Sequence, residues 1–260
     1  MLFCNIDLLD EKFETKRNQY VGVKDGRIAY IGASEPEEDF GERYDGRHRL
    51  LMPAFYNVHS HAPMTLLRGY AENLPLQRWL GEKVFPFEDQ IDDEAAYYGT
   101  LLAISEMLAS GTASFSDMYF FFGGMVPAIL ESGIKCNLSR GLTVFDDSDY
   151  TDLPAYRDNV RLRGEWNGAN NGRLIGDLCI HGEYTSNPKI VEAVAQHARE
   201  TGARIQIHLS ETQTEHEECK GRHGLTPAAY MEKHGIFDSP TTAAHCVWLE
   251  DEDFDILKRH

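Results

Sequence analysis

The sequence predicts an α/β fold, a (β/α)8 barrel of the TIM type represented by about six β/α units, preceded by a small β unit. Short apolar segments recur from residue 51 onward, and each ends in polar residues and is followed by a helical pattern. Strands that alternate with helices at this spacing imply a parallel sheet. Residues 1–50 differ, because their apolar residues alternate as in antiparallel strands.

The small β unit is predicted from one clear hairpin. In "QYVGVKDGRIAYIG", two runs of alternating apolar residues flank Asp25 and Gly26. An Asp-Gly dipeptide suits a tight turn between two paired strands. We therefore expect a hairpin that turns at these two residues.

Six segments are predicted as the barrel strands. Each is short and apolar and ends in polar or charged residues, which suits strands whose carboxyl ends meet at one mouth of a barrel. In chain order they are "LLMPAFYNVHSH", "TASFSDMYF", "IKCNLSRGL", "LIGDLCIHGEY", "RIQIHLSET" and "TTAAHCVWL".

Helices are predicted between these strands from their end signals. Residues 92–111 begin with acids and end in Ser-Gly, with Leu101, Leu102, Ser105 and Leu108 at helical spacing. Residues 187–203 have Asn187 as the expected N-cap, a proline in the first turn and Gly202 as the expected C-cap.

The C-terminal segment "EDEDFDILKRH" resembles the start of a helix, because acids precede apolar residues and basic residues follow. No stop signal follows it. A complete barrel needs about 250 residues, and fewer than that follow residue 50. We therefore expect a barrel truncated inside its sixth helix.

Composition narrows the class of partner. The chain has 25 Lys and Arg against 42 Asp and Glu, a formal net charge of −17, which repels nucleic acid and anionic membrane surfaces. The five cysteines are odd in number and lack a CxxC spacing, so free thiols in a reducing compartment are expected. The first residues lack a basic signal region and no apolar run reaches the roughly 18–20 residues of a membrane span, which predicts a cytoplasmic protein.

The candidate site residues all follow predicted strands, where the barrel mouth would bring them together. Imidazole is a preferred nitrogen ligand of Zn²⁺ and Fe²⁺, and catalytic sites have three protein ligands and an open position. His59, His61 and His208 could supply those nitrogens. The full set of candidates is His59, His61, Asp117, Arg140, His181, His208, Glu211 and His245.

A structural interpretation competes for each candidate. A lone histidine after a strand is more often a packed or solvated residue, and Asp117 or Arg140 could hydrogen-bond a loop or balance an acidic mouth. His59 and His61 differ, because two histidines on one face of an apolar strand cost desolvation unless something binds them. This pair favours a metal site, and a metal site in turn favours a functional interpretation of "HLSE".

Several segments resemble the amidohydrolase superfamily, and most closely its methylthioadenosine/S-adenosylhomocysteine deaminases, relatives of the triazine hydrolases. The segments are "LMPAFYNVHSHAPMTLLRG", "WLGEKVFPFED", "SRGL", "HLSET" and "AAHCVWL". The resemblance implies that residues 1–50 are the N-terminal part of a small β-sandwich domain and that residues 51–260 are an incomplete amidohydrolase barrel. The HxE and PCxxC signature of the cytidine deaminases is absent.

The resemblance also implies roles for individual residues. His59, His61 and His208 match the histidine ligands of one divalent metal, most simply Zn²⁺ with Fe²⁺ as the alternative. Glu211 matches the carboxylate that shuttles protons, and His245 matches the histidine that orients the attacking hydroxide. Four positions match the substrate pocket: Trp79, Glu88, Arg140 and His181. The family's fourth metal ligand, an aspartate after strand 8, has no counterpart.

The implied function is a metal-dependent hydrolytic deaminase of adenosine derivatives that releases ammonia and an inosine-type product. One alternative is a related amidohydrolase acting on another purine, a pyrimidine or a triazine, with an amino or chloro leaving group. Another is a catalytically inactive metal-binding fragment. The expected partner is a small-molecule substrate, with no nucleic acid and no membrane, and self-association into a homo-oligomer is left open.

Overall fold

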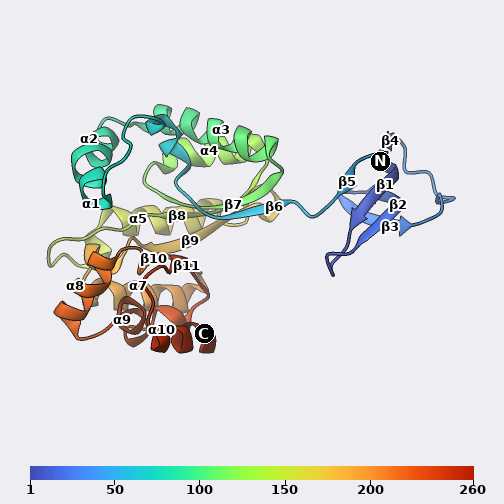
Figure 1. Cartoon of the computed structure of the whole chain (residues 1–260). Coiled ribbons are helices and arrows are strands. Elements are labelled where there is room, and N and C mark those ends of the chain that lie inside the picture. The colour runs from blue at the N-terminus through green and yellow to red at the C-terminus, as the bar shows by residue number, and fades with distance from the viewer. The chain divides into compact units, whose positions relative to one another are not determined.

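The structure, a computed structural model, describes residues 1–260 and divides into two compact units, Met1–Phe55 and Tyr56–His260 (Figure 1). The division falls five residues after the boundary expected from the sequence, within the segment predicted as the first barrel strand.

The N-terminal unit is a five-stranded sheet. The order is β3-β2-β1-β4, and β5 also pairs with β1. Asp25 and Gly26 join β2 to β3 with φ values of 52° and 71°, the left-handed conformations that a tight hairpin turn requires, so the predicted hairpin is confirmed. A sandwich needs a second sheet facing this one, and that part of the expectation stays a prediction. The strands are β1 (Leu2–Leu9), β2 (Thr15–Lys24), β3 (Arg27–Gly32), β4 (Arg43–Asp45) and β5 (Leu50–Leu51).

The second unit contains a six-stranded sheet in which the strands follow one another in chain order from β6 to β11. The pairs from β7 to β11 are parallel, as the alternation of strands and helices predicts. Each strand lies within one of the six predicted segments. They are β6 (Phe55–Ser60), β7 (Thr112–Tyr119), β8 (Lys135–Arg140), β9 (Leu174–Ile180), β10 (Ile205–Leu209) and β11 (Thr241–His245).

The sheet is strongly curved. His59 lies on β6 and His245 on β11, the two outer strands of the sheet, yet their ring centroids are 5.1 Å apart. Only a sheet that curls into a nearly closed barrel brings its outer strands this close. The fold is therefore a TIM-type barrel with six strands present, as the sequence predicts.

Helices cover the outside of the strands, with α3 and α4 on one side of Figure 1 and α7, α9 and α10 on the other. The helices are α1 (Leu76–Trp79), α2 (Phe85–Glu88), α3 (Asp93–Ala109), α4 (Phe122–Ser132), α5 (Pro154–Arg161), α6 (Ala169–Gly172), α7 (Pro188–Thr201), α8 (Gln213–His223), α9 (Pro227–Lys233) and α10 (Asp251–Arg259). None of these helices combines the length and the apolar character that a membrane-spanning helix requires.

The predicted helix ends are confirmed. The Asp92 side chain accepts from the amide of Ala95 at the start of α3, and Asn187 accepts from Ile190 at the start of α7. Gly202 ends α7 with a φ of 64°, where a side chain would be strained. The Asp92 and Asn187 side chains satisfy amides that the first helical turn leaves without partners.

The buried face of α3 is formed by its small residues and not by its leucines. Leu102 and Leu108 are 44% and 49% exposed, whereas Ala96, Gly99, Thr100, Ala103 and Ile104 are buried. Small residues lie on this face because a 3-10 turn, η1 (Ala62–Leu67), packs closely on it. A Cβ at Gly99 would lie 2.9 Å from the carbonyl oxygen of Pro63. This contact supports the segment directly after His61.

The core lies between the strands and their helices. One apolar cluster joins β9 and β10 to α7, and another joins β7 and β8 to α3 and α4. Fully burying a Leu or Ile side chain contributes about 1.5–3 kcal/mol, so these clusters hold the strand ends in fixed positions. All five cysteines are free, and four of them are buried.

Candidate functional site

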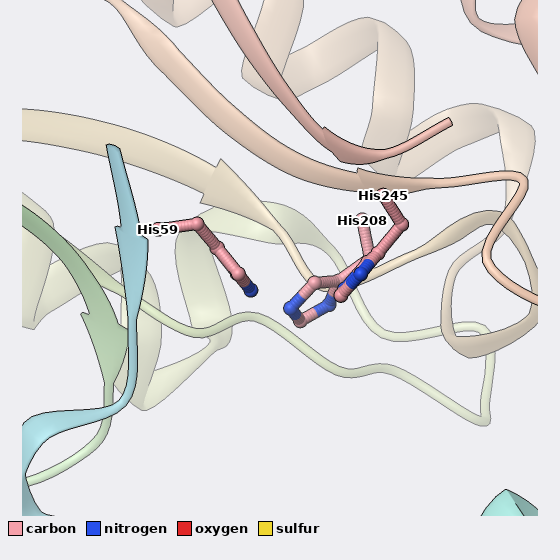
Figure 2. A group of neighbouring side chains, drawn as sticks. All are labelled: His59, His208 and His245. Atoms are coloured by element: carbon pink, nitrogen blue, oxygen red, sulfur yellow. The ribbon is translucent and has the colours of Figure 1, made fainter. Parts of the chain in front are cut away.

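Four histidine rings meet at the carboxyl ends of the strands. The ring centroid of His59 lies 4.8 Å from that of His61 and 4.9 Å from that of His208. Ring nitrogens of His59, His208 and His245 lie within 4.8 Å of one another. Figure 2 shows the rings of His59 and His208 pointing toward each other from different strands, with His245 beside His208.

Backbone carbonyls fix the orientation of two of these rings. The Nδ1 of His61 lies 2.7 Å from the carbonyl oxygen of Met118, and the Nδ1 of His208 lies 2.7 Å from that of His181. A carbonyl oxygen only accepts, so Nδ1 donates in both bonds and Nε2 carries the free lone pair. Metal-ligating histidines are commonly held by such a bond to the other ring nitrogen.

Burial keeps the imidazoles of His59, His61 and His208 neutral. It lowers the pKa of His59 to about 4, and the neighbouring histidines His61 and His245 act in the same direction. Burial also lowers the pKa of His61 and of His208 from its ordinary value. Neutral rings at pH 7 offer lone pairs, so the set of donors fits a divalent ion that prefers nitrogen ligands.

The three predicted metal ligands and the three histidines whose nitrogens cluster in the structure share two residues. His59 and His208 belong to both. His61, expected as the third ligand, lies beside the nitrogen cluster with its ring centroid 5.3 Å from that of His208. His245, expected to act on the attacking hydroxide, supplies the third nitrogen of that cluster.

The histidines line a cavity of about 320 Å³. Its size is typical of pockets for small organic ligands. Among the residues predicted for the site, the cavity wall includes His59, His61, Trp79, Glu88, His181, His208, Glu211 and His245.

Glu211 and His245 face each other across this wall. The Oε2 of Glu211 lies 3.7 Å from the Nε2 of His245, and both side chains are about a quarter exposed. His245 has a φ of 75°, in the left-handed region that is costly for a residue with a side chain. Such strain persists only where surrounding contacts enforce it, and it occurs often at functional sites.

His181 joins the cluster from the end of β9. Its ring centroid lies 4.8 Å from that of His208, and its Nδ1 is 3.0 Å from the Oγ1 of Thr185. Burial lowers the pKa of His181 to about 4, so the ring is neutral at pH 7. Because Nδ1 is bonded to Thr185, Nε2 is the nitrogen left for a ligand, and it donates or accepts one hydrogen bond according to the tautomer.

Glu88 has a partner that the sequence did not suggest. The hydroxyl of Tyr119 donates to its Oε1 at 2.6 Å, and both residues line the cavity. Burial raises the pKa of Glu88, and the Tyr119 bond opposes that rise. Tyr119 could have been found, because it lies two residues after Asp117 on the same strand and so on the same face.

The structure does not bring Arg140 to the cavity wall. Its Nε lies 3.1 Å from the Oδ2 of Asp158, and its guanidinium lies 4.7 Å from the ring centroid of Phe120. The cavity is lined instead by the neighbouring Gly141. A substrate contact for Arg140 stays a prediction.

Asp117 supports the histidines from below the cavity surface. It is fully buried, and its Oδ2 accepts from the hydroxyl of Ser60 and from the amide of Ala62, on either side of His61. Burial raises the pKa of Asp117 to about 7. Asp117 thus follows the structural interpretation of the sequence, as a hydrogen-bond partner of a neighbouring segment.

The remaining cavity wall is largely apolar, and sequence reasoning missed it. Four of these residues come from α1, α2 and the π-helix η2 (Leu80–Val84) between them, a segment whose apolar residues carry no chemical signal. The apolar wall residues are Met64, Leu76, Leu80, Val84, Phe85, Met118 and Phe120, with Tyr184 as a further aromatic residue.

The chain is similar to known proteins over most of its length. The chain is 40% identical over 244 residues to a protein of Syntrophomonas wolfei named 5-methylthioadenosine/S-adenosylhomocysteine deaminase. The match covers 93% of this chain and 56% of that protein, so the chain spans about half the length of its curated relative.

Solved structures show the same fold. An adenosine deaminase from Xanthomonas campestris with bound zinc has a TM-score of 0.83 and 24% identity, covering 99% of this chain and 60% of its own. A guanine deaminase from C. acetobutylicum has a TM-score of 0.88 and 20% identity, covering 99% and 65%. The model of the amidohydrolase family matches residues 50–260. The chain therefore belongs to the amidohydrolase family.

Proposed function

We propose that this chain forms the catalytic barrel of a metal-dependent deaminase that acts on an adenine nucleoside of the 5′-methylthioadenosine or S-adenosylhomocysteine type. The observation that carries the proposal is one cavity in which the histidine nitrogens adjoin the carboxylate of Glu211. The relative named for this activity supports the choice of substrate.

His59, His61 and His208 are the proposed ligands of one divalent ion. Their neutral rings and the carbonyl bonds at two of the Nδ1 atoms suit Zn²⁺, with Fe²⁺ as the alternative. The zinc in the solved adenosine deaminase supports this assignment. When bound, such an ion supplies Lewis-acid activation of a water molecule near neutral pH.

Glu211 is proposed to transfer protons, and His245 is proposed to hold the oxygen that is added. Water adds to C6 of the adenine ring, and Glu211 carries one of its protons to the ring nitrogen N1. Glu211 then transfers the second proton to the exocyclic amine, the C6–N bond breaks and ammonia leaves. His245, with its Nε2 3.7 Å from Glu211, holds the added oxygen by a hydrogen bond.

Substrate is proposed to be held by Trp79, Glu88 and His181. The free oxygen of Glu88 can accept from sugar hydroxyls, because only its Oε1 is taken by Tyr119. The apolar side chains of Leu76, Leu80 and Val84 suit the purine ring or a thioether group. The proposed substrate is a small molecule, and we propose that the enzyme acts in the cytoplasm. Self-association into a homo-oligomer stays a prediction.

Ammonia release from 5′-methylthioadenosine tests the proposal. The zinc-loaded protein should release one ammonia per nucleoside, with the absorbance shift from adenine to hypoxanthine, and Glu211→Gln should abolish both. Glu217→Gln, an exposed glutamate on α8, is the matched control and should stay active. The proposal would be contradicted by a protein that binds zinc but releases no ammonia from any adenine nucleoside. Release of ammonia from guanine, or of chloride from a chlorotriazine, by that protein would then identify the alternative substrate.

A further inference from the structure

A buried carboxylate outside the cavity wall contacts the backbone of Glu211. Glu215, on the first turn of α8, is 4% exposed. Its Oε1 accepts from the amide of Ser210 at 3.1 Å, and its Oε2 accepts from the amide of Glu211 at 2.8 Å. Both oxygens are thus bound to consecutive amides of the loop between β10 and α8.

This arrangement differs from ordinary helix capping. Thr212 is the N-cap of α8, and its side chain accepts from the amide of Glu215. In a capping box, the glutamate at this position would accept from the amide of the N-cap residue itself. The carboxylate of Glu215 instead reaches the two residues before the cap, one of which is the proposed proton carrier.

Ser210 extends the contact to the end of β11. It is fully buried with a φ of 50°, and its carbonyl oxygen accepts from the amides of Val247 at 3.0 Å and Trp248 at 2.9 Å. These two residues closely follow His245, and Cys246, which lies between His245 and Val247, has a φ of 51°. A run of left-handed residues is costly, so contacts with neighbouring segments must hold it in place.

We propose that Glu215 is a positioning residue that holds Glu211 and, through Ser210, the segment after His245 in the geometry that catalysis requires. The inference rests on the proposed function, because it concerns Glu211, the proposed proton carrier, and His245, which is proposed to hold the added oxygen. Glu215 does not line the cavity and acts only through the backbone that it binds. A misplacement of about 1 Å can cost about 10²-fold in rate, so this restraint affects turnover.

Glu215→Gln tests the proposal in the zinc-loaded protein. The amide keeps the size of the side chain but offers one acceptor and turns an N–H group toward a backbone N–H. We expect kcat to fall by about tenfold or more, with KM changed less than about threefold and the zinc content unchanged. Glu217→Gln, on the same helix but exposed, should change kcat less than about twofold.

Two kinetic outcomes would overturn the proposal. One is a Glu215→Gln variant with kcat within about twofold of the wild type. The other is a loss of kcat matched by an equal loss of zinc or by an equal loss in the Glu217 control, because the effect would then be a general loss of structure.

Amide hydrogen exchange provides a readout that does not depend on activity. In Glu215→Gln the amides of Ser210, Glu211, Val247 and Trp248 should exchange faster, and in Glu217→Gln they should not. If the wild type deaminates no nucleoside, the proposed function fails and this exchange pattern alone decides the positioning role. Should Glu215→Gln not fold, hydrogen exchange of the wild type decides. Slow exchange of the amides of residues 210 and 211 supports the contact with Glu215, and exchange as fast as that of an unprotected loop amide overturns it.

Discussion

Tyr119 and Glu88 are joined by a hydrogen bond of 2.6 Å between the end of β7 and α2, and both line the same cavity. The bond holds one carboxylate oxygen of Glu88 and leaves the other for a ligand. It also opposes the rise in pKa that burial imposes on Glu88. The pair therefore fixes the position of the proposed sugar contact, and the bond favours its charged form.

Tyr119→Phe is expected to raise KM for an adenine nucleoside by about tenfold with a smaller effect on kcat. The reason is that a hydrogen bond to a charged group contributes about 1.5–3 kcal/mol, and about 1.4 kcal/mol corresponds to tenfold in affinity. Steady-state kinetics on the zinc-loaded protein measure this. Tyr98→Phe, at an exposed tyrosine of α3, is the control, and equal KM values in the two variants would contradict the prediction.

His61→Ala is expected to lower zinc content more than His245→Ala. The ring of His61 is oriented by the carbonyl oxygen of Met118, as ligating histidines commonly are, whereas the Nε2 of His245 lies near Glu211. Elemental analysis after dialysis against a weak chelator measures retained zinc. Full retention in His61→Ala together with loss in His245→Ala would show that the ion is held by His59, His208 and His245, the nitrogens that cluster most tightly.

Asp117 should make stability fall as the pH rises. Burial raises its pKa in the folded protein to about 7, from an ordinary value of 3.8. Between these values the folded state holds a proton that the unfolded state has lost, so the favourable contribution is complete below pH 3.8 and is lost as the pH rises through about 7. The slope from this group is about 1.4 kcal/mol per pH unit.

Asp117→Asn removes that slope, because an amide does not titrate. We expect the difference in free energy of unfolding, wild type minus variant, to decrease steadily from about pH 5 to about pH 7. Urea denaturation of the zinc-free proteins at three pH values measures it. A difference that stays constant with pH would mean that Asp117 has no raised pKa.

The order of strands and helices could be predicted because its signals are local. Asp25 and Gly26 specify a turn, and Asn187 and Gly202 specify the two ends of α7 by satisfying backbone groups. The histidines could be predicted as a group because each follows a predicted strand, and the carboxyl ends of parallel strands converge wherever the fold is a barrel.

The rest depends on specific side-chain and backbone contacts, some within one segment and some between segments distant in the chain. The bond from Tyr119 to Glu88, the pairing of Arg140 with Asp158 and the reach of Glu215 to Ser210 each depend on side-chain positions that periodicity does not specify. The buried face of α3 is another case. The leucine spacing predicts the helix, but the buried face lies at the small residues because a neighbouring turn approaches the backbone of Gly99.

Gly124→Ala is expected to destabilise the protein, for the same reason of close approach. A Cβ at Gly124 in α4 would lie 2.0 Å from the carbonyl oxygen of Asp93 and 2.8 Å from the amide nitrogen of Tyr97 in α3. Backbone atoms cannot rotate away, so the two helices must separate. Overpacking of this kind costs about 1–3 kcal/mol in the free energy of unfolding.

Gly221→Ala is the matched control within another helix. Gly221 lies in α8, and a Cβ added there would have no neighbouring atom within 4 Å, so alanine meets open space. Alanine favours a helix over glycine by up to about 1 kcal/mol, so this variant should be as stable as the wild type or more so. Urea denaturation followed by circular dichroism compares the two. Equal stability of Gly124→Ala and Gly221→Ala would mean that α3 and α4 do not pack backbone to backbone.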